Sequence, residues 1–382
     1  MSGHTLMERD VKQSMNTIRA FLKRKNVTLS LQRYGIDALA AMAQGLFCTL
    51  LVGTILNTLG QQLNIGFLNE TVVTLKQGAQ LIGYTIGGLA SALVGPGIAV
   101  AIGFALQAPP LVLFSLITVG FTANAMGGAG GPLAVYVIAI LACEAGKLIS
   151  KETKVDILVT PIFTILVGVG AASVIAAPIG AAASAVGDFV KWATVLQPFW
   201  MGILVSVIIG ITLTLPISSA AICAALSLTG LAGGAAVAGC CAQMVGFAVM
   251  SFRENRWGGL IAQGVGTSML QMPNIVKNPK IWIPPILVSA ITGPLATCLF
   301  KLEMNGSAVS SGMGTCGFVG QIGIYTGWVA DVASGAKVAI TAADWIGLVL
   351  ICFILPAILS WTFCNILQKI GWIRGNDLKL EL

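Results

Sequence analysis

Long stretches of this sequence contain no charged side chain. The widest are residues 77–143, 157–187 and 192–252. Each can hold one or more runs of about 20 apolar residues, the length that crosses a bilayer as a helix. We therefore predict an all-α fold, a polytopic integral membrane helix bundle. Counting half-length pieces, it has roughly ten transmembrane segments, drawn from residues 36–58, 80–106, 109–123, 132–150, 157–180, 197–215, 217–250, 281–300 and 344–368.

Two glycine-dense segments interrupt these apolar runs, at residues 125–132 and 311–320. An unpaired backbone amide in hydrocarbon costs several kcal/mol, so non-helical backbone at this depth must be covered by protein or line a water-filled cavity. We expect re-entrant, glycine-rich hairpins that line a site. The alternative is close helix packing through small residues. The candidate residues are Asn124, Gly127 and Gly128 for the first segment and Thr315, Cys316 and Gln321 for the second.

A third segment places hydroxyl groups on both sides of a helix-breaking proline, Pro216. Buried hydroxyls without partners are costly, and the proline also frees backbone groups. This combination suits a ligand site. An equally good interpretation is a proline kink whose loose carbonyls are satisfied by nearby serines. The candidate residues are Thr214, Ser218 and Ser219.

A fourth segment, residues 264–274, combines glycine, hydroxyl and amide side chains and is followed by Lys277 and Lys280. It predicts an interrupted helix that ends in a polar turn, although an ordinary short hairpin connector would have a similar composition. The side chains that would supply hydrogen bonds to a ligand are Thr267, Ser268, Gln271 and Asn274.

Composition agrees with a membrane protein. Of the 382 residues 56% are apolar and only 9% are charged, far below the roughly 25% of a soluble domain, and the mean hydropathy is +0.91. The net charge of +7 is concentrated in short segments. It therefore indicates membrane topology and not a surface for nucleic acid.

The two ends of the chain carry much of this basic charge. Residues 1–34 hold seven Lys and Arg against Glu8 and Asp10, and three more basic residues follow residue 368. Both termini are therefore expected in the cytoplasm. Apolar residues from Val11 to Leu22 repeat at helical spacing, which suits an amphipathic helix on the membrane surface or, alternatively, a solvated basic tail. We divide the chain into a basic amphipathic segment (1–34), a transmembrane domain (35–368) and a cytoplasmic tail (369–382).

The sequence offers no self-contained catalytic site. His4 is the only histidine, and the nine cysteines lack the spacing of a metal site, so they are expected to be buried small hydrophobes. A phosphate-binding loop of the Walker type is also missing. We expect no enzyme activity of the chain alone, no cofactor and no metal.

Residues 152–168, with one proline early in an apolar run, and a second proline in residues 177–180 resemble the membrane (IIC) component of the sugar phosphotransferase system, of the fructose type. The resemblance extends over about residues 80–325. Residues 264–273 fall where these permeases carry a Gly-Ile-Thr-Glu signature, and residues 314–319 where they carry a Pro-His-Gly-Gly turn. This chain lacks the acidic residue of the first motif and the histidine of the second. The whole pattern is most similar to a divergent branch that includes regulators of perfringolysin production.

The resemblance implies a homodimeric permease in a bacterial inner membrane, with separate IIA and IIB proteins as partners for any phosphotransfer. The expected function is translocation of a small polar solute, a sugar or a sugar-like compound, by alternating access. The alternative is a membrane-embedded sensor or regulator that binds a ligand without phosphorylating transport, since the two motif residues are missing. A passive channel is less favoured, because no ring of repeated charges or carbonyls is evident.

Overall fold

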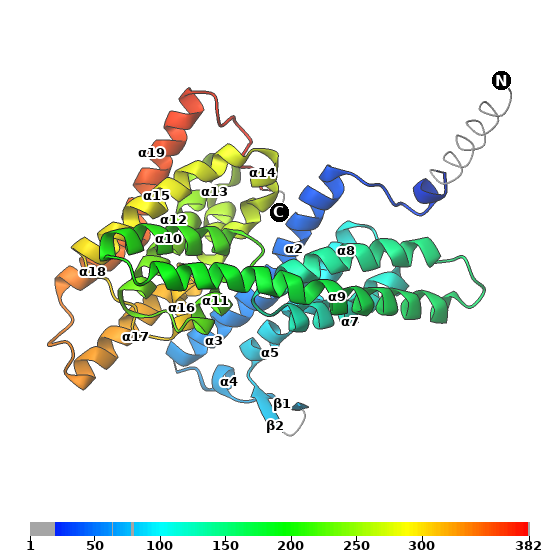
Figure 1. The fold of residues 1–382 in the computed structure, drawn as a ribbon, viewed down its shortest axis with the longest axis horizontal. Coiled ribbons are helices and arrows are strands. Elements are labelled where there is room, and N and C mark those ends of the chain that lie inside the picture. Colours follow the sequence, from blue (N-terminus) through cyan, green and yellow to red (C-terminus); the bar gives the residue numbers. More distant parts are fainter. Residues whose placement is uncertain (1–19, 63, 78–79, 381–382) are drawn as a thin grey trace.

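The computed structural model describes residues 20–62, 64–77 and 80–380, and most of them are helical (Figure 1). Within these residues six helices are long and apolar enough to cross a membrane, or up to seven if the bent pair α5–α6 counts as one span. The predicted all-α, polytopic membrane bundle is therefore confirmed, whereas the number of about ten segments stays a prediction. The amphipathic helix predicted around Val11 lies largely outside the described residues.

The first half of the molecule contains a helical rod (residues 33–62), a small β-hairpin, a bent pair of helices and a pair of antiparallel helices. Short 3-10 or π-helical turns, written η, join several of the helices. The elements are η1 (Arg33–Asp37), α2 (Ala38–Leu46), η2 (Phe47–Leu51), α3 (Val52–Gln62), α4 (Gly66–Asn69), β1 (Val73–Gln77), β2 (Gln80–Tyr84), α5 (Ile86–Ala92), α6 (Val94–Ala105), α7 (Pro110–Gly127), η3 (Gly128–Gly130) and α8 (Gly131–Ile149).

The β1–β2 hairpin is a departure from the predicted helices. Its strands pair antiparallel, with Val73 opposite Tyr84, so the span predicted at residues 80–106 begins as a strand. The helix starts only at Ile86, because the Thr85 hydroxyl accepts the Gly88 amide and caps it. α5 and α6 then meet at an angle of 56°.

The first glycine-rich segment reverses the chain between α7 and α8. Gly128 has a φ of +52°, a conformation that favours glycine. The two helices run antiparallel, since a Cβ on Gly146 near the end of α8 would lie 2.9 Å from Val112 near the start of α7. Prolines in the first turns of both helices fix where each begins.

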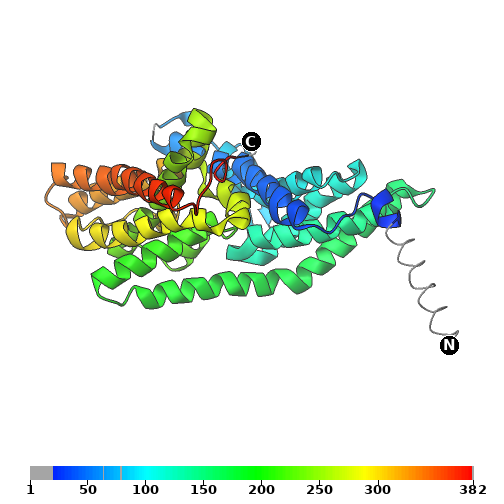
Figure 2. The same cartoon turned by 90° about the horizontal axis from the view of Figure 1, so that it is seen from above.

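The long helix α9 (Asp156–Ala193) runs beside both halves of the molecule (Figures 1 and 2). Beyond it the second half comprises α10 (Pro198–Thr214), α11 (Ser219–Ala225), α12 (Gly230–Met250), α13 (Phe252–Ile261), η4 (Ala262–Gly266), η5 (Ser268–Gln271), α14 (Met272–Lys277), η6 (Pro279–Trp282), α15 (Ile283–Pro294), η7 (Leu295–Leu299), α16 (Ala308–Ser311), η8 (Cys316–Phe318), α17 (Val319–Ser334), α18 (Ala342–Val349), η9 (Leu350–Ile354) and α19 (Leu355–Lys369).

Glycines bring α10, α12 and α15 together with backbone against backbone. A Cβ on Gly239 of α12 would lie 1.9 Å from the Ser206 carbonyl oxygen of α10, and one on Gly293 of α15 would lie 2.1 Å from the carbonyl oxygen of Gly202. Such contacts allow no side chain at either glycine. This part of the bundle is thus held by close packing of small residues, as in other membrane helix pairs.

Seven of the nine cysteines are buried, in agreement with their expected role as small hydrophobes, whereas Cys48 and Cys298 are exposed.

Candidate functional site

A central cavity lies where the glycine-rich and polar segments of the sequence meet. Its volume is about 50 Å³, and none of its fourteen lining residues is Asp, Glu, Lys or Arg. By this measure one water needs about 10–15 Å³, so the cavity holds a few waters and is too small for a sugar ring. The lining residues are Leu46, Leu50, Leu51, Pro132, Leu213, Leu215, Ile217, Ser218, Ser219, Ala220, Thr267, Met269, Met313 and Cys316.

Residues 214–219 form a true break between α10 and α11. Ser218 caps α11, because its hydroxyl accepts the Ala221 amide at 3.2 Å. The Ser219 hydroxyl donates to the Gly312 carbonyl at 2.7 Å. The two serines therefore satisfy backbone groups at the break, as the proline-kink interpretation requires, and they also line the cavity.

This break also contacts the turn between α7 and α8, since the Ser218 amide donates to the Ala129 carbonyl at 3.0 Å. Asn124, Gly127 and Gly128 lie on or beside that turn. Of the first segment only Pro132 reaches the cavity lining.

The second glycine-rich segment closes another side of the cavity. Gly314 and Gly317 have φ values of +52° and +51°, and a Cβ on Gly314 would lie 2.6 Å from that of Cys240. The chain thus leaves helical geometry where it approaches α12 most closely. Cys316 lines the cavity, whereas Thr315 donates to the Met244 sulfur at 3.5 Å.

Gln321 follows this segment on α17 and points at α12. Its Nε2 donates to the Cys241 sulfur at 3.2 Å, while its Oε1 is buried and has no hydrogen-bond partner within the described part of the chain. It does not line the central cavity.

The fourth segment is an interrupted helix, as predicted. Helical geometry ends at Gly266, Thr267 is extended, and a 3-10 turn then leads into α14. The Thr267 hydroxyl accepts the Met269 amide at 3.1 Å and lines the cavity. The Ser268 hydroxyl lies behind the cavity wall, 2.8 Å from that of Thr214.

Gln271 and Asn274 face away from the central cavity. Their side chains bind each other at 2.8 Å, and Gln271 Nε2 also donates to the Gln263 Oε1 at 2.8 Å. Their amide groups hold the end of the chain as well: Gln271 donates to the Leu378 carbonyl at 3.0 Å and Asn274 to the Lys379 carbonyl at 2.9 Å.

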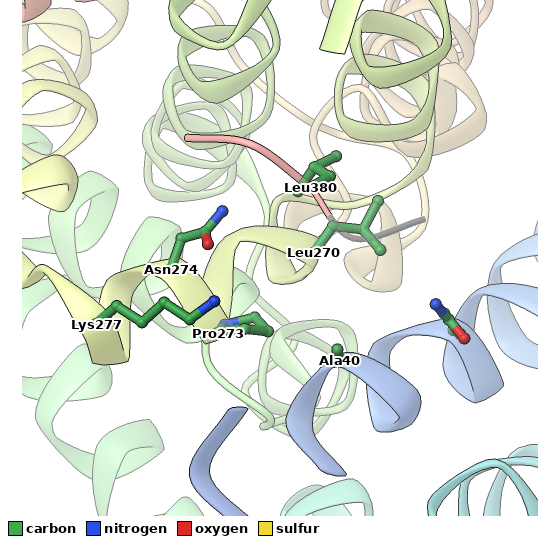
Figure 3. Close-up of a pocket in the computed structure, with 7 residues that line it drawn as sticks. Ala40, Leu270, Pro273, Asn274, Lys277 and Leu380 are labelled. Atoms are coloured by element: carbon green, nitrogen blue, oxygen red, sulfur yellow. The ribbon is translucent and has the colours of Figure 1, made fainter. Parts of the chain in front are cut away.

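We call residues 373–380 the C-terminal strap. Ile373, Leu378 and Leu380 are buried, and Asn255 both donates to the Leu378 carbonyl and accepts the Leu380 amide, each at 2.8 Å. Figure 3 shows Leu380 next to Leu270, with Asn274 on the neighbouring helical turn. Together with Ala40, these residues leave a hollow of only about 20 Å³. The segment predicted as a tail therefore packs onto the polar turn.

The sequence prediction missed a buried network beside the cavity, centred on Gln243 of α12. Its Oε1 accepts the Trp282 indole N–H at 2.8 Å and the Thr214 hydroxyl at 3.2 Å. On the other side, the Ser289 hydroxyl lies 3.4 Å from Gln243 Nε2. The signal that could have revealed it is the Gln243 amide in the middle of an apolar run, because a buried amide needs hydrogen-bond partners.

Of the predicted residues, the cavity thus brings together Ser218, Ser219, Thr267 and Cys316. The other predicted residues lie outside its lining, and Gln271 and Asn274 hold the strap. Within the described residues, no group of three or more His, Cys, Asp or Glu side chains could hold a metal ion.

A sequence profile of the EIIC proteins of the phosphotransferase system matches residues 36–380 of this chain. The match covers α9, all residues that line the central cavity and the whole C-terminal strap. The chain belongs to the EIIC family. Comparisons with curated proteins and with solved structures found no match.

As a member of the EIIC family, the chain is a multi-pass membrane protein with the general role of a sugar permease. The usual partners of such permeases are IIA and IIB proteins. EIIC domains are membrane transport components without a phosphotransfer site of their own. The uncharged cavity is compatible with a neutral polar solute.

Proposed function

We propose that this EIIC protein binds a sugar or a sugar-like solute in the central cavity and translocates it by alternating access. The observation that carries the proposal is the convergence of four interrupted segments, far apart in the sequence, on one uncharged cavity. Broken helices near the middle of a transporter offer free backbone groups to a solute. The cavity lining adds three hydroxyl groups and the thiol of Cys316 to these backbone groups.

The small volume of the cavity requires that its walls move for a sugar to enter. The lining includes residues at two breaks that are able to act as hinges, namely the non-helical stretch around Pro216 and the turn that holds Gly314 and Gly317. Hinges are commonly a few residues at the ends of helices that absorb a change in φ and ψ. In the closed form Thr267 and Ser219 use their hydroxyls within the protein, and in the open form they would bind the solute.

The test is sugar binding to the purified protein in detergent, measured by calorimetry with a panel of hexoses, disaccharides and alditols. Thr267→Val removes one hydroxyl and keeps the shape of the side chain. One hydrogen bond is worth about 0.5–1.5 kcal/mol, so we expect affinity to fall about two- to tenfold. Thr362→Val, a change of the same kind at an exposed position of α19, is the matched control. Equal sugar affinities of the two variants would show that the sugar does not bind in the central cavity.

A second candidate function is a ligand sensor that binds without transport. It is favoured by the strap, whose carbonyls occupy the amide donors of Gln271 and Asn274. A sensor would bind a sugar in detergent yet show no sugar uptake in liposomes supplied with IIA and IIB proteins. In a sensor, deleting residues 1–30 would abolish signalling and leave sugar binding intact. A transporter would show no such separation and would take up the sugar that it binds.

We further propose a homodimer in the bacterial inner membrane with both termini in the cytoplasm. The basic residues near both ends support that orientation. The long apolar face of α9, where Ile162, Leu166 and Val174 are exposed, is available to lipid or to a second copy. Cross-linking through single cysteines on this face in native membranes would give a covalent dimer if two copies meet here.

A further inference from the structure

A basic pocket lies at the end of the molecule far from the central cavity, and it shares no lining residue with that cavity. Residues 24–26, the connection between α6 and α7, and the end of α8 with the residues after it form its walls. Figures 1 and 2 both show the first described residues of the chain beside the α8–α9 connection. The volume of the pocket is about 380 Å³, within the range of small-molecule sites.

The lining of the basic pocket is strongly positive. Its charged residues are Arg24, Lys25, Lys147 and Lys151 against the single carboxylate of Glu152, so the lining has a net charge of +3. Uncharged polar groups of Asn26, Gln107 and Ser150 lie between them. Glu152 and, outside the lining, Glu144 pair with three of these four cations, and the surplus of positive charge in the lining favours a further anion.

One of these cations is fixed inside the protein. The Lys147 side chain is only 1% exposed, and its ammonium lies 2.9 Å from a Glu144 oxygen and donates to the Leu106 carbonyl at 3.0 Å. Arg33 donates to the same carbonyl at 2.6 Å. The floor of the pocket is therefore held rigidly and keeps its charge in place.

The start of α7 adds to the positive potential. Pro109 lines the pocket and is the residue before the first turn of this 18-residue helix. The unpaired amides and the positive end of the helix dipole therefore lie at the pocket, where they favour an anion.

Glu152 now occupies the place that such an anion would take. Its carboxylate lies 2.9 Å from Arg24 and 2.5 Å from Lys25. The hydrogen bond from Lys25 holds the pKa of Glu152 below its usual value, with Arg24 contributing less. Because Glu152 is on a loop and its side chain is 38% exposed, it can swing out into solvent.

We propose that the basic pocket binds a phosphate group, which displaces Glu152 from Arg24 and Lys25. A phosphate offers more acceptor oxygens and more charge than a carboxylate, and guanidinium and ammonium groups bind it by short, charge-assisted hydrogen bonds. The phosphate belongs either to an anionic lipid headgroup, which basic pockets between membrane helices bind, or to a free phosphate compound.

The test uses four variants of the full chain with opposite expected effects. Arg24→Gln and Lys151→Gln each remove one cation and should weaken phosphate binding about three- to tenfold, the worth of a partly exposed charge-assisted bond. Glu152→Gln removes the internal competitor and should tighten binding by a similar factor. Lys154→Gln changes the charge on the same loop outside the lining and should leave binding unchanged. Lys147 is left intact, because it supports the fold.

Two arms separate the sources of the phosphate. In detergent, inorganic phosphate is titrated at constant ionic strength and binding is followed by calorimetry. In nanodiscs of phosphatidylcholine, phosphatidylglycerol is added and retained lipid is counted by native mass spectrometry. A response with the predicted order of variants in the lipid arm alone identifies a headgroup, and in the phosphate arm alone a free compound. Binding in neither arm, or affinities that do not differ between Glu152→Gln and Lys151→Gln, would overturn the proposal.

Discussion

Leu378 is the most deeply buried side chain of the C-terminal strap, with only 1% of it exposed. Replacing a buried leucine by alanine removes packed carbon atoms and leaves a cavity, at a cost of about 2–4 kcal/mol. Since each 1.4 kcal/mol is a factor of ten, Leu378→Ala should raise the population of the undocked strap about 30-fold to several hundred-fold. The hydrogen bonds to Gln271 and Asn274 would be lost in that form.

Hydrogen exchange measures this opening directly. The Leu380 amide donates to the Asn255 side chain only while the strap is docked, so its exchange should accelerate by the same factor in Leu378→Ala. Lys379→Ala is the matched control, because the Lys379 side chain is exposed and its backbone carbonyl is unchanged. If the two variants exchanged alike, or if the native strap already exchanged as fast as a free peptide, the docking of the strap would be refuted.

Three further predictions concern other parts of the molecule. Gln243→Leu leaves the Trp282 indole N–H without its acceptor and should cost about 1–3 kcal/mol of stability in a detergent unfolding assay; adding Trp282→Phe should recover part of that loss. Gly239→Val should prevent stable folding, because even a Cβ would lie 1.9 Å from the Ser206 oxygen, and a monodisperse, native-like elution peak would contradict the close packing. The pKa of Glu152 is lowered in the folded protein, so its ion pairs stabilise the fold at a pH above the ordinary pKa near 4.5, and this stability is lost as the pH falls through the lower folded pKa. Hydrogen exchange in residues 20–26 should therefore accelerate only at such acidic pH.

The sequence predicted the features that depend on local chemistry. Uncharged runs marked the helices, and the spans predicted at residues 109–123 and 132–150 begin within one residue of α7 and α8. The helix breaks at Pro216 and Thr267 also lie where the sequence placed them, because proline removes a backbone hydrogen bond from a helix and closely spaced glycines weaken it.

The features that sequence patterns missed depend on contacts between distant segments. An apolar stretch such as residues 80–84 fits a strand as well as a helix, and only its pairing with residues 73–77 decides between them. Gln271 and Asn274 were chosen as ligand-binding groups because buried amides need partners. The strap, more than 100 residues later, supplies such partners, and periodicity contains no information about that contact.

Family membership limits the class of solute, and the central cavity is the place where it should bind. Cys316 lines that cavity and is 1% exposed, whereas Cys298 is exposed elsewhere on the molecule. Two variants, each retaining one of these cysteines and having the other eight replaced by alanine, would report on the two places separately.

The most direct test is the rate at which a small methanethiosulfonate reagent modifies Cys316 in membranes. Modification requires the cavity to open, and a sugar that binds there should slow it in proportion to occupancy, while the Cys298 variant reacts at an unchanged rate. A sugar that binds by calorimetry yet leaves the Cys316 rate unchanged would contradict the placement of the solute site.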